Sequence, residues 1–160
     1  PAGYTVVKNH EGFAYAAEEL ARRGYFAVAI NAVRGVYTAS DSDAEWEDMV
    51  WPVFLEHVKH FTKWNNGTET TPAAIGVSLQ NRFDFNNIGF VGHSRGALAG
   101  PQPGPIKASL LVEPGEPVSV SSMRPPGGVQ VNLLGTCDEE VQLAGLEYFD
   151  SRIASTEPTW

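Results

Sequence analysis

Ser94 has the setting in this chain that is best suited to chemistry. It stands in Gly92-His93-Ser94-Arg95-Gly96, a G-x-S-x-G pentapeptide that follows a mostly apolar run over 88–91. This pattern predicts a strand that turns sharply into a helix and holds the serine hydroxyl out at the carboxyl edge of a sheet. Gly92 and Gly96 suit such a turn, because it leaves no room for side chains on either flank. A hydroxyl held in this way could act as a nucleophile.

A serine nucleophile needs a partner, because its hydroxyl reacts weakly at neutral pH unless a neighbouring imidazole takes the proton. The chain has four histidines, which are His10, His57, His60 and His93. His57 and His60 are expected on the surface or edge of a helix, and His93 is adjacent to Ser94 in sequence. The structural alternative is an ordinary tight turn in which Ser94 caps the following helix.

The elements that must position Ser94 alternate between helices and strands. Apolar residues recur at helical spacing over 13–23, with Gly24 in the C-cap position, and again over 46–64, where Pro52 is expected to kink or split the helix. Apolar runs predict strands at 25–30, 88–91, 108–112 and 129–134, and a last helix is predicted over 139–153. The alternation indicates one α/β domain over 1–160, with a mainly parallel sheet and helices on both faces. Glycines and prolines over 100–105 predict that the helix after Ser94 is very short.

Composition and charge exclude several classes of partner. The 160 residues carry a formal net charge of −8, and the 11 Lys and Arg residues are scattered, which argues against nucleic acid. No apolar run approaches the roughly 18 residues that a membrane span needs. The single cysteine, Cys137, excludes an internal disulfide and is expected to be a small buried residue beside a strand end. The acidic residues over 41–48 lack a metal-loop pattern, so no metal is expected, and no cofactor is implied.

The pentapeptide and its surroundings resemble the α/β-hydrolase superfamily, on the side of the bacterial serine esterases and lipases. The resemblance rests on 17–25, on 84–89 with the pentapeptide, and on Leu133-Leu134-Gly135-Thr136-Cys137-Asp138, which is similar to the family's strand and acid-bearing loop. It implies an α/β-hydrolase-like fold in a minimal or truncated version, with the order serine, acid, histidine along the chain. Asp138 falls in the place of the acid. No histidine follows it, so the chain resembles a family member cut before that residue.

The resemblance also implies roles for the other candidate residues. Ser94 would attack the carbonyl of a carboxylic ester, Asp138 would orient the base, and the Arg95 N–H would stabilise the oxyanion. Asp138 has a structural rival role as the N-cap of the next helix. Glu113 is the second choice for the acid, and Glu116 is a poorer one.

The identity of the base stays open at this stage. The chain could be truncated before it, a partner chain such as a second copy could supply it, or an earlier histidine could substitute. His10 precedes the first helix, where the family's oxyanion loop lies, and His93 occupies a position that in the family packs beneath the turn. Both are weaker candidates than Ser94 and Asp138 are for their roles.

The sequence therefore predicts a soluble serine hydrolase, cytoplasmic or secreted, that acts on small-molecule carboxylic esters through an acyl-enzyme on Ser94. The first alternative is a catalytically incomplete domain or fragment of the same fold with a binding or assembly role. A third class, a flavodoxin-like nucleotide or cofactor binder, is disfavoured because neither a G-x-G-x-x-G nor a Walker-type loop is present.

Overall fold

The chain divides into two compact units, Pro1–Ser40 and Asp41–Trp160. The computed structural model describes residues 8–32, 43–99, 106–115, 128–137, 143, 145, 146 and 150. Among the described helices, none combines the length and the apolar character needed to cross a bilayer.

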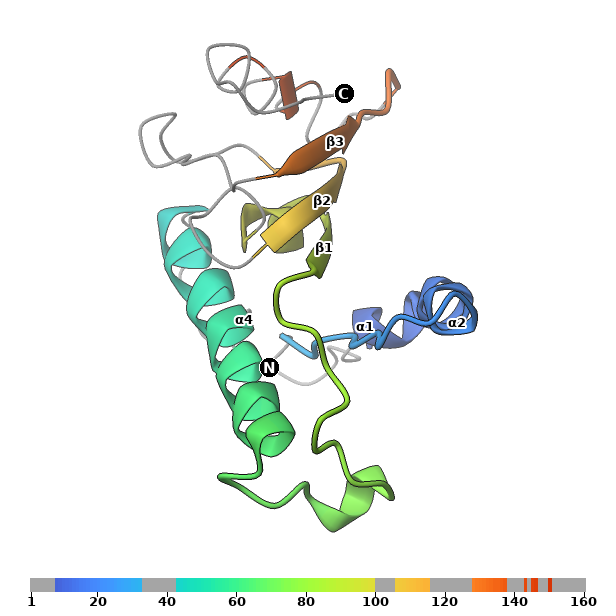
Figure 1. Ribbon diagram of the computed structural model, residues 1–160. Helices are drawn as coiled ribbons and strands as arrows, with labels where there is room; N and C mark the ends of the chain where they lie inside the picture. The colour runs from blue at the N-terminus through green and yellow to red at the C-terminus, as the bar shows by residue number, and fades with distance from the viewer. Residues whose placement is uncertain are drawn as a thin grey trace, which may run out of the picture. The chain divides into compact units, whose positions relative to one another are not determined.

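The second unit is built on a three-stranded parallel sheet in the order β1-β2-β3 (Figure 1). β1 spans Ile88–His93, β2 spans Ile106–Val112 and β3 spans Val129–Leu133, so the strands predicted on either side of Ser94 are confirmed. Parallel strands need crossover connections, and the helices beside this sheet place the unit in the α/β class. The register pairs His93 with Val112 and Val112 with Leu133, so the three strands end in one row.

A long helix, α4, spans Asp43–Asn66 and packs against η2, the short 3-10 helix Ser94–Ala99. The short helix predicted after Ser94 is therefore confirmed. The ring of Phe54 on α4 meets Phe90 on β1 edge to face, with 5.7 Å between the ring centroids. These aromatic contacts join α4 to the sheet.

The helix α4 continues through Pro52, so the predicted split is wrong (Figure 1). Proline removes one N–H from the helix ladder. Trp51 and Phe54 flank the proline and stack on each other, with 5.3 Å between their centroids. Packing on both sides of Pro52 offsets the missing hydrogen bond.

The sheet has one face packed against α4 and η2 in the described residues. The register places Phe90, Ser109 and Gln130 on this face, followed by Gly92 and Leu111. Ser109, Gln130 and Leu111 are buried. The opposite face carries apolar side chains that are between 37% and 56% exposed, namely Val91, Val129, Val131 and Leu133. Helices were expected on both faces, and within the described part of the chain they cover one.

The first unit holds two short helices, α1 at Asn9–Gly12 and α2 at Ala14–Arg22. The helix predicted over 13–23 is thus confirmed. Gly24 follows its C-cap with a φ of +89°, which favours glycine because a β-carbon is strained there.

The strand predicted over 25–30 is wrong in the described structure. These residues have no regular secondary structure, and Tyr25, Phe26 and Val28 are 61%, 52% and 46% exposed. A strand is held by the N–H and C=O groups of a neighbouring strand, and the described sheet is made entirely of strands from the second unit. The apolar composition suits a strand, but composition supplies no pairing partner.

The helix predicted over 139–153 lies largely outside the described residues. Gly145, Leu146 and Asp150 are helical. A β-carbon on Gly145 would collide with Leu134 and come within 2.9 Å of Pro114, so this glycine packs closely on the segments that follow β2 and β3.

Phe54→Ala should destabilise the second unit by roughly 3 kcal/mol, because it removes a buried ring that contacts both Trp51 and Phe90. Leu55→Ala is the matched control, since its side chain is 38% exposed, and it should cost less than about 1 kcal/mol. Denaturant unfolding followed by helical circular dichroism measures both values. Equal costs for the two variants would show that the aromatic cluster does not hold α4.

Candidate active site at the carboxyl edge of the sheet

Ser94 is the first residue after β1 and the first of η2. Its φ is +52°, in the left-handed region that residues with side chains seldom adopt. The chain therefore leaves β1 through a sharp turn and does not run into a continuous right-handed α-helix. Ser94 is partly exposed at this turn. The turn predicted from the pentapeptide is present.

The two glycines of the pentapeptide differ in their surroundings. A β-carbon on Gly92 would lie 2.5 Å from the Cα of Ala97, 2.7 Å from the carbonyl oxygen of Gly96 and 2.8 Å from the ring of Phe90. A β-carbon on Gly96 would meet nothing within 4 Å. The expected crowding is confirmed at Gly92, because η2 folds back over the end of β1 there, and is wrong at Gly96, which borders open space.

Glu113 holds the matching position on the neighbouring strand. It directly follows Val112, the register partner of His93, and its φ is +44°. Its N–H donates a hydrogen bond of 2.9 Å to the carbonyl of Leu133. Its Oε2 is buried and has no hydrogen-bond partner among the described residues. Leaving a buried carboxylate oxygen without a donor is unfavourable, and such atoms are uncommon in proteins.

Backbone contacts connect the segments that follow the three strands. The N–H of Gly115 donates a hydrogen bond of 3.3 Å to the carbonyl of Ser94. A β-carbon on Gly115 would lie 3.8 Å from the backbone nitrogen of Arg95. The carboxylate of Glu113 lies against Gly135, where a β-carbon would collide with Oε1. Gly115 and Gly135 carry no motif in the sequence, and the only signal for them is their position just past the ends of β2 and β3.

The remaining candidates near this edge are placed as follows. Arg95 and His93 are both exposed. Asp138 and Glu116 lie outside the described residues. Cys137 is also exposed, so the prediction that it is buried is wrong. The strand β3 ends at Leu133, which leaves Cys137 in the turn beyond the strand.

The histidines of α4 are held by groups of that helix and of the loop after it. The Nδ1 of His57 lies 2.7 Å from the carbonyl oxygen of Val53. His60 stands between Glu56 and Glu69, with nitrogen-to-oxygen distances of 3.4 Å and 3.5 Å. Both match the prediction of helix-surface residues.

His10 belongs to α1 of the first unit. Its Nδ1 is buried and has no hydrogen-bond partner in the described ranges of the chain. Within the part of the chain that the structure describes, no three His, Cys, Asp or Glu side chains gather as metal ligands.

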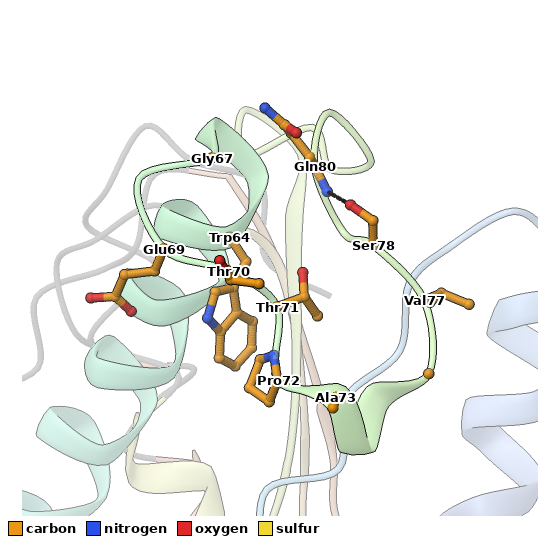
Figure 2. Close-up of a pocket in the computed structure, with 11 residues that line it drawn as sticks. Trp64, Gly67, Glu69, Thr70, Thr71, Pro72, Ala73, Val77, Ser78 and Gln80 are labelled. Carbon is orange, nitrogen blue, oxygen red and sulfur yellow. Dashed lines mark hydrogen bonds between the residues drawn. The ribbon is translucent and has the colours of Figure 1, made fainter.

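A pocket of about 410 Å³ lies at the C-terminal end of α4. Figure 2 shows Trp64 of α4 beside Pro72, with Thr71 close by, and the 3-10 helix η1, Ala73–Ile75, follows in the same loop. Glu69 at the wall of this pocket accepts a hydrogen bond from Lys63, and this contact lowers the pKa of the Glu69 carboxyl. The pocket shares no lining residue with the edge that carries Ser94.

No family model, curated protein or solved structure matches this chain. The functional assignment therefore rests on the geometry of the strand ends.

Gly92→Ala should destabilise the second unit by about 2 kcal/mol or more, because two of the three close contacts are with backbone atoms that cannot move aside. Gly96→Ala is the matched control, and it should be neutral or stabilise the fold by up to about 1 kcal/mol. Thermal unfolding of the two variants measures the difference. Similar melting temperatures would contradict the close approach of η2 to β1.

Ser94→Gly should be more stable than Ser94→Ala by about 1 kcal/mol, because glycine adopts a positive φ without strain and alanine does not. Both variants remove the hydroxyl, so the comparison isolates the backbone. Parallel denaturant titrations measure it. If alanine were the more stable residue at position 94, the left-handed turn would be absent in solution.

Proposed function

We propose that this chain is a serine hydrolase of the α/β-hydrolase type that cleaves small-molecule carboxylic esters. The observation that carries the proposal is the left-handed conformation of Ser94 immediately after a parallel strand, within a G-x-S-x-G motif. Strained residues persist where the surrounding structure imposes the strain, and they cluster at active sites. A helix N-cap serine adopts a β-region backbone, so the φ of +52° counts against a purely capping role.

In the proposed reaction, the Oγ of Ser94 attacks the ester carbonyl while a base takes its proton. The tetrahedral intermediate collapses, the base returns the proton to the leaving alcohol, and an acyl-enzyme forms that water then hydrolyses. The backbone N–H of Arg95 directly follows the nucleophile, which is the usual place of one oxyanion donor. Each such donor contributes about 3 kcal/mol to catalysis.

A carboxylate would orient the base from one of the two neighbouring strand ends. Glu113 follows β2, and Asp138 comes after β3 in the place that the family resemblance implies. The base itself would be His93 or a histidine of a second copy.

The second candidate function is a catalytically incomplete domain of the same type that binds a ligand or a partner. The observation in its favour is that His57 and His60, the histidines of α4, contact groups of that helix and of the loop after it. Without an imidazole the Ser94 hydroxyl is not activated. Reactivity of Ser94 separates the two functions.

A fluorophosphonate probe should label Ser94 covalently, because an activated serine displaces fluoride from phosphorus and an unactivated one does not. Mass spectrometry of the intact chain and of its peptides locates the adduct. Ser94→Ala is the control and should remain unlabelled. Among His10→Ala and His93→Ala, a loss of labelling by about 100-fold identifies the base. A folded wild-type chain that stays unlabelled would support the non-catalytic function.

A further inference from the structure

We infer that Glu113 is the carboxylate that positions the general base of Ser94, and that Gly135 makes the room in which this carboxylate sits. The inference rests on the proposed function and chooses between its two candidate acids. Glu113 is a positioning residue in this scheme, because it acts on Ser94 through the imidazole.

Glu113 and Ser94 leave the sheet at neighbouring positions. Each is the first residue after its strand, and the strands are direct neighbours whose last residues, His93 and Val112, are paired in register. The hydrogen bond from the Gly115 N–H to the Ser94 carbonyl ties the two segments together past the ends of the strands. The separation between the two backbones is therefore set by the sheet.

One oxygen of the Glu113 carboxylate is buried and, among the described residues, unpaired. This oxygen, Oε2, lacks a hydrogen-bond donor in the part of the chain that the structure describes, which is unfavourable for folding. A positive φ of +44° adds strain at the same residue. A carboxylate kept only for stability would be paired or exposed. An imidazole N–H is the donor that would satisfy this oxygen while leaving the other ring nitrogen for the Ser94 proton.

The carboxylate of Glu113 lies directly against Gly135. A β-carbon at this position would collide with Oε1 of Glu113 and lie 3.1 Å from its Cδ. Gly135 is not among the glycines with a positive φ, so its backbone conformation does not require glycine. Glycine is required there because the Glu113 carboxylate occupies the space that a side chain would need. Any side chain there would displace the carboxylate.

The order of the strands favours Glu113 over Asp138 as the acid. It follows β3, which is separated from β1 by β2, whereas Glu113 follows the strand adjacent to the one that ends at Ser94. The edge therefore favours Glu113 on the geometry of the described residues.

The test measures the rate of fluorophosphonate labelling and the hydrolysis of p-nitrophenyl acetate for wild type and a set of variants. Glu113→Gln should lower both rates by at least about 100-fold through kcat, with KM nearly unchanged, because the base loses its orientation. Glu113→Asp should restore part of the activity. Asp138→Asn should stay within about threefold of wild type. Thermal unfolding should show that Glu113→Gln is as stable as wild type or more so, since an acceptor oxygen without a donor among the described residues is replaced by an amide group.

Gly135→Ala tests the same inference in a second way, because it displaces the carboxylate while Glu113 itself stays in the sequence. It should slow labelling in the wild-type background and have no further effect in the Glu113→Gln background, because the two changes act on one group. Gly89→Ala is its control, because the atom nearest to an added β-carbon there is the carbonyl oxygen of Ala108 at 3.9 Å, and it should leave the rate unchanged.

Four results would overturn the inference, and they separate it from the proposed function. If Glu113→Gln reacted at the wild-type rate, or if Glu113→Gln and Gly135→Ala had additive effects on the labelling rate, Glu113 would not be the acid. The proposed function would still stand. A loss of about 100-fold in Asp138→Asn with Glu113→Gln intact would assign the acid to Asp138. An unreactive wild-type Ser94 would overturn the proposed function together with this inference.

Discussion

The register of three parallel strands is the constraint on which the candidate site depends. Because His93, Val112 and Leu133 lie in one row, the residues that follow them leave the sheet side by side. Side chains alternate between the faces of a strand, so a shift of one residue would send Phe90 to the open face and carry Ser94 away from Glu113. The contact of Phe90 with Phe54 of α4 depends on this register, so the packing of the unit and the geometry of the edge are set together.

The same row concentrates unfavourable backbone conformations. Ser94 and Glu113 both have positive φ values directly after their strands. The contacts around them are of the kind that can impose such conformations: η2 folds back onto Gly92, and Gly115 is hydrogen-bonded to Ser94. Strain at two neighbouring strand ends is difficult to explain by chain reversal alone, since a glycine could serve at either position without cost. The presence of side chains at positions 94 and 113, where glycine would be less strained, therefore supports the proposed roles of Ser94 and Glu113.

Local pattern was sufficient for much of the second unit. Three strands, the long helix and the short turn after Ser94 follow from apolar periodicity, glycines and prolines that act within a few residues. The failures concern relations between distant segments. Within the described residues the apolar run at 25–30 has no strand to pair with, and the crowding at Gly92 but not at Gly96 depends on how η2 folds back. The contact between Glu113 and Gly135 joins residues on different strands, so only the register of β2 and β3 discloses it.

The exposure of Cys137 has a practical consequence. It is the one cysteine of the sequence, and it stands in the turn that follows β3, on the edge of the sheet where Ser94 and Glu113 leave their strands. A maleimide fluorophore or nitroxide would attach at this single thiol with no need to remove others. Such a reporter would sense the arrival of a ligand at the strand ends by spectroscopy, independently of any turnover.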